Sequence, residues 1–294
     1  MNQHIFFSSP FNFCGLESNK STWKSSRIVI IPVPYDLTTT YVPGTRLGPH
    51  AIIKASQQLE LFDDELEQEI AAIGIHTLPE LAVVTSGPSE MIERVKIVAE
   101  KVIRAGKFPV MLGGEHSLSL GMIQALCKTS PGIGVLQFDA HADLRATYQG
   151  SPFNHACVAR RIQELCPLVQ VGIRSMSTEE FTFLSRSNVV SFSDRHVQNE
   201  PRWVAMIIEN LPQTIYITID LDVLDPSVMP SVGTPEPGGL NWHEIINCLR
   251  SVTKERHVVG FDIVELCPQP MNTGADFLAA KLCYKLLGYI HCRQ

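Results

Sequence analysis

The sequence predicts an α/β fold with a central, mainly parallel sheet and helices on both faces. Short apolar, β-branched runs alternate with helical patterns along the chain, as in parallel sheets with helical crossovers. The predicted strands are apolar on both faces, which is typical of strands buried between two helical layers. Of 294 residues, 45% are hydrophobic and 18% charged, enough to bury a large core. We expect one domain over residues 1–294, with residues 1–26 wrapping the surface.

The predicted elements follow one another in regular alternation. Seven apolar runs read as strands, at residues 27–33, 108–112, 133–138, 168–172, 189–192, 214–219 and 257–264. Helical spacing of apolar residues predicts helices at residues 49–61, 90–106, 118–128, 155–165, 178–186, 201–210, 242–252 and about 275–290. The segment 43–49 is expected to be a turn with Pro49 at an early helical position.

Composition restricts the partners and the compartment. The net charge of −6 and the pI near 5.9 disfavour nucleic acid and anionic membranes, and favour a small cationic or neutral substrate. No apolar run approaches the roughly 20 residues of a membrane-spanning helix, and we expect no signal peptide. The eight cysteines form no Cys-x-x-Cys pair, which indicates buried thiols in a reducing compartment. We therefore expect a cytoplasmic protein.

Asp139, His141 and Asp143 form the most informative motif of the chain. They follow the apolar run 133–138 at alternate positions. Charge at the end of a buried strand is costly unless a partner neutralises it. A divalent cation is the partner that two carboxylates and an imidazole favour.

Three other predicted strands also end in side chains that can bind a cation or a charged ligand. His116 follows the strand 108–112, Asp220 and Asp222 follow 214–219, and Glu265 follows 257–264. Ligands of open α/β sheets bind beyond the carboxyl ends of the strands, so these residues share one edge. Taken singly, His116 would more often be a turn residue and Asp220 with Asp222 a turn pair. Taken together, they favour a metal site.

The chemistry of the set favours manganese. Four carboxylates and two imidazoles, shared between two divalent ions, leave a site close to neutral. Oxygen-rich donors with some imidazole suit manganese better than zinc. Two such ions, roughly 3.5–4 Å apart, can share one water and lower its pKa. The predicted metal ligands are His116, Asp139, His141, Asp143, Asp220 and Asp222.

Two further residues are open to more than one interpretation. His155 begins a helix after a Gly-Ser-Pro loop, so its ring could lie in solvent or carry protons at the mouth of the metal site. Glu265 is an acid at the end of an apolar strand and must meet a cation, either a structural arginine or a cationic substrate. Asp262, three residues earlier, is expected to support the site as a neighbour and not as a ligand.

Three blocks of the sequence resemble the signature motifs of the ureohydrolase family, which includes arginase, agmatinase, guanidinobutyrase and formimidoylglutamase. The blocks are Gly-Gly-Glu-His at 113–116, Asp-Ala-His-Ala-Asp at 139–143 and Asp-Leu-Asp-Val-Leu-Asp-Pro at 220–226. The segments 43–49 and 233–239 extend the match. The resemblance implies the three-layer α/β/α arginase/deacetylase-like fold and a centre of two Mn²⁺ ions. It implies the ligands His116, Asp139, Asp143 and Asp222, with His141 and Asp220 completing the set.

The resemblance also implies a reaction. A metal-bridging hydroxide would attack the guanidinium carbon, and the tetrahedral intermediate would collapse to urea and an amine. His155 would be the proton shuttle and Glu265 would pair with the guanidinium group, which prefers a bidentate acidic partner. Family members commonly form trimers or hexamers, so a homo-oligomer is expected.

The substrate is predicted less directly. Arg145 stands where arginase-like enzymes carry an Asn that holds the amino-acid head of arginine, while the segments 39–46 and 153–161 look more like agmatinase. We therefore expect agmatine to be hydrolysed to putrescine and urea, a step of polyamine biosynthesis. Guanidinobutyrase, guanidinopropionase, arginase and formimidoylglutamase activities remain alternatives, as do, more remotely, a deacetylase-like amidohydrolase and a non-catalytic metal-stabilised scaffold. The roles of Arg145 and the loop 231–239 in selectivity stay open.

Overall fold

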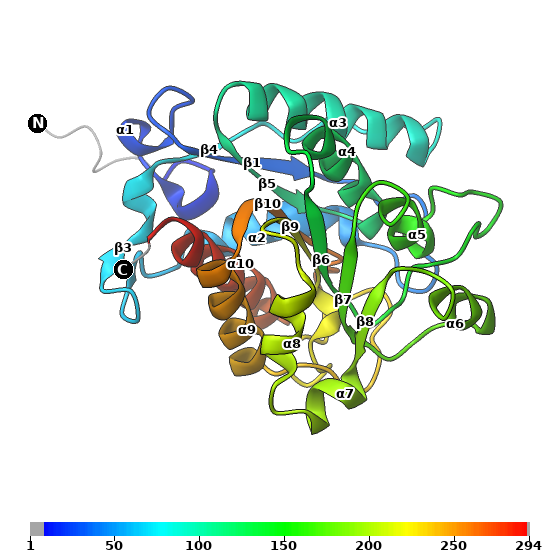
Figure 1. Cartoon of the computed structure of the whole chain (residues 1–294). Coiled ribbons are helices and arrows are strands. Elements are labelled where there is room, and N and C mark those ends of the chain that lie inside the picture. Colours follow the sequence, from blue (N-terminus) through cyan, green and yellow to red (C-terminus); the bar gives the residue numbers. More distant parts are fainter. Residues whose placement is uncertain (1–8, 293–294) are drawn as a thin grey trace, which may run out of the picture.

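An eight-stranded parallel sheet forms the centre of the computed structural model, which describes residues 9–292 (Figure 1). The strand order is β4-β1-β5-β10-β9-β6-β7-β8, and every pairing is parallel. The strands are β1 (Ile28–Val33), β4 (Ile75–Thr77), β5 (Phe108–Gly113), β6 (Gly134–Phe138), β7 (Leu168–Ile173), β8 (Val190–Ser193), β9 (Thr214–Asp220) and β10 (His257–Val264).

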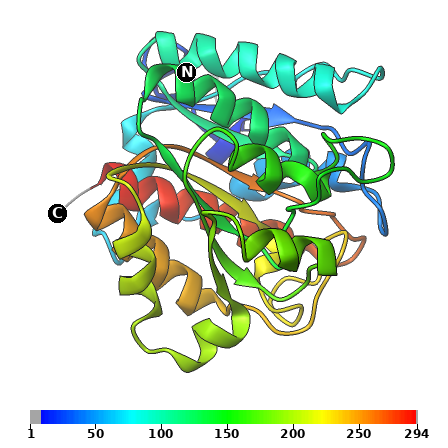
Figure 2. The same cartoon turned by 45° about the vertical axis from the view of Figure 1, so that its right-hand side comes forward.

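Helices cover both faces of this sheet, as two views of the molecule show (Figures 1 and 2). One face packs against α3 (Pro88–Arg104), α4 (Ser119–Thr129) and α5 (Val158–Ile162). The other packs against α2 (Gly48–Ser56), α8 (Trp203–Asn210), α9 (Trp242–Glu255) and α10 (Thr273–His291). Because alternate strand residues point to opposite faces, each strand serves two separate apolar cores. The predicted three-layer α/β/α fold with a parallel sheet is confirmed.

The seven predicted strands are present, and the differences concern shorter elements. The strand β4, the hairpin β2 (Phe62–Asp63) with β3 (Gln68–Glu69), α1 (Ser18–Ser21) and α7 (Asp194–Asn199) were not predicted, because two to six residues carry too little periodicity. The helix predicted over 49–61 is wrong beyond Ser56, where the chain turns into the hairpin. The helix predicted over 155–165 divides into a 3₁₀ turn (His155–Cys157) and α5. The helix α6 (Thr178–Leu184) is also present, ending two residues early.

Strand register brings the predicted ligands to one level. The four strands that end in candidate ligands are direct neighbours, in the order β5-β10-β9-β6. Val264 pairs with Asp220, and Phe138 pairs with Ile219. Glu265 directly follows Val264, and Asp139 directly follows Phe138. Both therefore lie beside Asp220 at the carboxyl edge of the sheet. The sheet thus provides the common edge that the sequence predicted.

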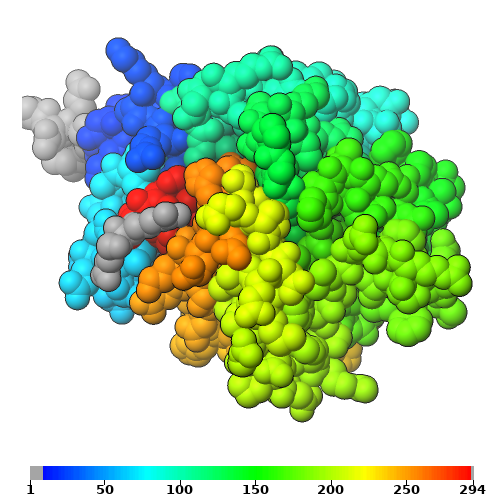
Figure 3. Space-filling view, in the orientation of Figure 1, coloured from blue at the N-terminus to red at the C-terminus, as the bar shows by residue number. Residues whose placement is uncertain are grey.

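Two segments pack against parts of the fold that are distant in sequence: the N-terminal segment around Phe13 and the hairpin of β2 and β3. Phe13 is fully buried, and its backbone N–H donates to the hydroxyl of Thr77 at 2.9 Å. The hairpin of β2 and β3 lies beside α10 (Figure 3). There the ammonium of Lys285 donates to Asp63 and Glu65, at 3.0 and 2.5 Å.

The prediction of one domain with a surface-wrapping segment at 1–26 stays a prediction, and residues 1–8 of it lie outside the described residues. All eight cysteines are free thiols. Between residues 9 and 292, no helix combines the length and the apolar character needed to cross a bilayer.

Candidate metal centre and active site

The predicted ligands meet around Asp139 at the carboxyl edge of the sheet. The Nδ1 atom of His116 lies 3.0 Å from Oδ2 of Asp139, and 3.4 Å from the nearest oxygen of both Asp143 and Asp220. His116 is fully buried, and the three carboxylates are at most 5% exposed. One group of potential metal ligands thus consists of His116, Asp139 and Asp220, with Asp143 beside it.

A second group shares Asp139 with the first. The Nδ1 atom of His141 lies 2.8 Å from Oδ2 of Asp222 and 3.7 Å from Oδ1 of Asp139. Asp139 therefore turns one oxygen toward each imidazole, so both groups of potential ligands include it. Nδ1 of His116 is buried and has no hydrogen-bond partner among the described residues. This orphaned nitrogen, within a set of four carboxylates, fits a pair of divalent cations.

Local backbone structure aims these side chains. The strand β6 ends at Phe138, and Asp139 then accepts the backbone N–H of His141 at 2.6 Å. Asp143 has a positive φ of 52°, an uncommon conformation for a non-glycine residue. Asp220 accepts the N–H of Asp222 at 2.9 Å in a tight turn. The three residues of the first acidic block thus do not continue an extended strand; the turn gathers their side chains into the cluster.

The cluster is electrostatically unfavourable without cations. Burial first, and then the charge of Asp139, raises the pKa of Asp143 to about 7. Burial opposes the protonation of His141, but Asp222 and the neighbouring carboxylates outweigh it and raise its pKa to about 11. The site therefore retains protons that a divalent cation would displace. Metal uptake by such a site releases protons.

His155 lies at the wall of a cavity of about 130 Å³ beside the cluster, with His141, Asp143, Arg145 and Thr234 among the other residues that line it. Its backbone N–H donates to the hydroxyl of Thr38 at 2.9 Å. Its ring Nε2 is buried and has no hydrogen-bond partner among residues 9–292. Burial, followed by the charges of His141 and His116, lowers the pKa of His155 to about 4. The ring is therefore neutral near pH 7.

Glu265 stands where β10 gives way to a loop and is 7% exposed. Its φ of 63° turns the side chain back toward the cluster, and its Oε1 accepts the backbone N–H of His116 at 2.7 Å. Burial, followed by the charge of Glu115, raises the pKa of Glu265 well above its usual range. No arginine or lysine contacts its carboxyl group among the described residues, so a cationic ligand is the partner its position favours.

Arg145 lies on the cavity wall and is held away from the centre. Its Nε is 3.7 Å from Oε2 of Glu180, and its guanidinium lies 4.6 Å from the ring centroid of Tyr148. Glu180 is itself fixed, because it accepts the backbone N–H groups of Leu144 and Ser177. The charge of Arg145 is thus largely balanced within the wall of the site.

Sequence reasoning assigned no role to Glu115, although it belongs to the block 113–116. Its buried carboxyl group accepts the N–H and the hydroxyl of Thr38, and so holds the loop that contacts His155. Gly114 makes this possible, because a Cβ there would lie 1.8 Å from the carbonyl oxygen of Tyr35. An acid next to two glycines in the block 113–116 was the one sequence feature that could have indicated a role for Glu115.

Arg174 was also missed, and nothing in the sequence around it marks its role. Its guanidinium donates to the backbone carbonyls of Asp222 at 2.8 Å and Glu236 at 3.0 Å, and its Nε donates to that of Pro237 at 3.1 Å. It therefore ties the loop 231–239 to the metal-ligand turn. The carboxylate of Glu236 comes within 3.8 Å of Nε2 of His141. The loop thus delivers an acid to the rim of the site.

Fold and site together define an α/β protein with a buried carboxylate–imidazole cluster that could hold metal ions, at the carboxyl edge of a parallel sheet. The sequence model of the arginase family matches residues 26–288. The chain belongs to the arginase family, and it is a hydrolase of the agmatinase, or ureohydrolase, type.

Individual relatives are similar over nearly their full length. The N(1)-aminopropylagmatine ureohydrolase of Synechocystis sp. is 39% identical over 293 residues, which cover 97% of this chain and 95% of that one. The N(1)-aminopropylagmatine ureohydrolase of Thermus thermophilus is 40% identical, over 90% of this chain and 91% of its own. The crystal structure of the agmatine ureohydrolase of Thermoplasma volcanium matches with a TM-score of 0.88 and 30% identity, covering 98% of this chain and 96% of that one.

Proposed function

We propose that the protein hydrolyses the guanidinium group of a linear guanidino amine, giving urea and a primary amine, with two Mn²⁺ ions per subunit. The observation that carries this proposal is the position of Asp139, which offers one oxygen to the His116 group and the other to the His141 group. The six-residue set of His116, Asp139, His141, Asp143, Asp220 and Asp222 supports two ions better than one. The predominance of carboxylate oxygens supports manganese.

When bound by this six-residue set, the ions would supply a water of lowered pKa as the nucleophile. The protein's own residues would orient the substrate and handle the protons. Glu265 would pair with the guanidinium group, because its buried carboxyl group faces the cluster and has no cationic partner among the described residues. His155, neutral near pH 7 and facing the cavity, would accept a proton and pass it to the departing amine. Water adds at the guanidinium carbon, the bond from that carbon to the substituted nitrogen breaks, and urea and the amine leave.

N(1)-aminopropylagmatine is the first candidate substrate, because the relatives from Synechocystis and Thermus, at 39% and 40% identity, are ureohydrolases of that compound. Agmatine, which the sequence motifs favoured, is the second, supported by the solved relative from Thermoplasma. Both are cationic, in keeping with the net charge of −6 and with Glu236 at the rim. We further propose a cytoplasmic homo-oligomer, a trimer or hexamer, and the eight free thiols support the reducing compartment.

Urea release from a panel of guanidino compounds tests the proposal. Manganese-loaded protein is incubated with N(1)-aminopropylagmatine, agmatine, 4-guanidinobutyrate, arginine and formimidoylglutamate, and bound metal is counted by elemental analysis. We expect two ions per subunit and the highest kcat/KM with N(1)-aminopropylagmatine. Turnover restricted to agmatine would change the substrate and keep the reaction. At most one ion per subunit, or hydrolysis of an acetylated polyamine without urea release from any guanidino compound, would refute the proposal.

A further inference from the structure

Asp262 is a buried carboxylate outside the predicted ligand set. It lies in β10, is fully buried, and pairs in register with Thr218 of β9. The hydroxyl of Thr218 donates to its Oδ1 and the hydroxyl of Tyr216 donates to its Oδ2, each at 2.6 Å. Neighbouring residues of both strands, such as Ile217 and Ile263, pack into the apolar core on the opposite face. A charged group in such a place requires a reason.

The hydroxyl of Thr218, which binds Asp262, also contacts the ring of His116. The hydroxyl oxygen of Thr218 is 3.0 Å from Nε2 of His116, whose Nδ1 faces the carboxylate cluster. A threonine hydroxyl carries one hydrogen. The 2.6 Å bond to the carboxylate of Asp262 uses that hydrogen in preference to the longer contact of 3.2 Å with the hydroxyl of Ser119. The oxygen of Thr218 must therefore accept a proton from His116, so Nε2 is the ring nitrogen that keeps its hydrogen. Nδ1 is then the nitrogen that gives up its proton to a cation.

We infer that Thr218 and Asp262 are positioning residues that hold the imidazole of His116 with Nε2 protonated and Nδ1 directed at the metal centre. The metal part of this inference rests on the proposed function, whereas the hydrogen-bond order does not. Neither residue touches the cavity or the carboxylate cluster. Their effect reaches the site through His116, because outer partners of a metal-ligating histidine fix both its ring orientation and its basicity.

Among residues 9–292, the second imidazole has no comparable support. Nε2 of His141 faces Glu236 at 3.8 Å, beyond hydrogen-bond distance, and the side chain of His141 is 23% exposed. One cation would therefore bind through His116, which is held by the buried pair Thr218 and Asp262 (the relay). The other would bind through His141, whose ring is less restrained. Disrupting the relay should weaken one of the two ions and spare the other.

A matched pair of substitutions tests the relay. Thr218→Val removes the hydroxyl and nearly preserves the shape, whereas Thr218→Ser keeps the hydroxyl. Mn²⁺ is titrated into each metal-free protein by calorimetry. We expect Thr218→Val to weaken one of two binding events by about 10–100-fold, and Thr218→Ser to stay within about threefold of the wild type on the same scale. If Thr218→Val binds both ions as tightly as the wild type, the inference is wrong.

Two further measurements keep the inference open to refutation if Thr218→Val does not fold. Asp262→Asn offers an amide N–H to Thr218, which frees the threonine hydrogen to face His116, so we expect the same selective loss of one ion. In the metal-free wild type, ¹⁵N NMR of the histidine rings should show Nε2 of His116 protonated at every pH at which the protein is folded. A deprotonated Nε2 would overturn the relay even if the enzyme releases urea. Absent urea release with a protonated Nε2 would instead count against the proposed function.

Discussion

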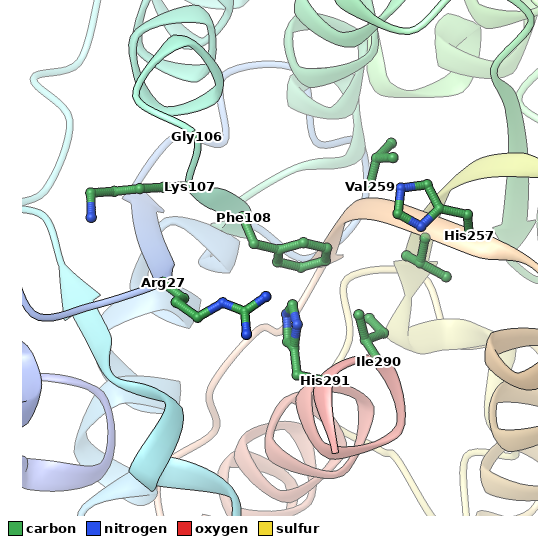
Figure 4. A pocket seen from close by; sticks show the side chains of 9 residues that line it. Arg27, Gly106, Lys107, Phe108, His257, Val259, Ile290 and His291 are labelled. Atoms are coloured by element: carbon green, nitrogen blue, oxygen red, sulfur yellow. The ribbon is translucent and has the colours of Figure 1, made fainter. Parts of the chain in front are cut away.

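The two ends of the parallel sheet gather different kinds of polar side chains. At the carboxyl end, four aspartates crowd around His116 and His141. At the amino end, Arg27, Lys107, His257 and His291 line a cavity of about 460 Å³. Figure 4 shows Arg27, before β1, and His291, at the end of α10, pointing toward one another near Phe108. The carboxyl end thus holds four clustered carboxylates, whereas the amino end holds the cations Arg27 and Lys107.

Helix termini account for the basic side chains at the amino end of the sheet, but they do not account for the buried carboxylates at the carboxyl end. The helices α3, α9 and α10 end beside the amino edge, where their last carbonyl groups carry partial negative charge that favours cations. Lys107 is further committed to the carbonyl of Ser26 at 2.6 Å and to the ring of Trp23. Arg27 and His257 are exposed to water. By contrast, the aspartates are buried and face one another, so burial and mutual repulsion both oppose their charges. Burial and crowding distinguish a functional charge cluster from a structural one.

Replacing Asp139, the carboxylate shared by both ligand groups, should have the largest effect on activity and metal binding. Asp139→Asn removes the charge that faces both imidazoles, and we expect urea release to fall by at least ~10³-fold, because an ion that activates water contributes several kcal/mol. Metal content should fall below two ions per subunit. The metal-free variant should melt no lower than the wild type, because a repelling buried charge is gone.

The control for this variant is Asp225→Asn, the same change in another of the acidic blocks, 220–226. Asp225 is turned toward the Ser227 hydroxyl and lies outside the ligand cluster. Its urea release and metal content should match the wild type. Two tightly bound ions in Asp139→Asn would show that the shared carboxylate is not needed for the centre.

Glu265→Gln should have the next largest effect. The amide oxygen can still accept the N–H of His116, so metal content should stay unchanged. The negative charge opposite the guanidinium is lost, and a hydrogen bond to a charged group contributes about 1.5–3 kcal/mol, or roughly 10–100-fold in kcat/KM. Steady-state urea release with elemental analysis measures both effects. An unchanged kcat/KM would remove Glu265 from the substrate site.

These contrasts also show what sequence can predict. The sheet, its helical layers and the edge that gathers His116, Asp139, Asp220 and Glu265 follow from apolar runs that end in polar residues, because parallel strands share a direction. Local spacing carries this information within each block. The predicted ligands accordingly lie together in the structure.

Spacing does not show which residues support the site from a distance. Arg174 acts through backbone carbonyls, which have no sequence signature. Asp262 was expected to support the site, but its partner Thr218 stands in an apolar strand, and their pairing depends on the register between β9 and β10. The positive φ of Asp143 and Glu265 comes from the packing around the turns. Interactions that depend on register and tertiary packing were therefore beyond the reach of pattern reasoning.

A change on the amino side of the fold should affect stability and leave function intact. Glu65 accepts hydrogen bonds from Lys285 at 2.5 Å and Tyr289 at 2.7 Å. Partial burial favours the neutral acid, but these bonds outweigh it and lower the pKa of Glu65 below the usual 4.5. We expect Glu65→Gln to reduce the free energy of unfolding by about 1–2 kcal/mol at pH 7, after allowance for solvent screening.

The pH dependence of this loss has a definite sign. A lowered pKa stabilises the fold at pH values above 4.5, and the contribution disappears as the pH falls through the lower folded value. The difference between the wild type and Glu65→Gln, measured by urea denaturation, should therefore shrink in acid. Glu67→Gln, in the same hairpin but exposed, is the control. A difference that persists below the folded pKa would contradict a charge-based role.

Arg27→Ala should have the smallest effect of all. The guanidinium is exposed and lies at the far edge of the sheet from the metal centre, where helix termini already account for the basic side chains. Surface changes of this kind usually alter stability by less than about 0.5 kcal/mol, and urea release should stay within about twofold, by the same scale. A larger change in kcat/KM, with the melting temperature unchanged, would mean that the amino-end cavity communicates with the metal centre. The two ends would then be coupled, and the structural account of the basic side chains would be wrong.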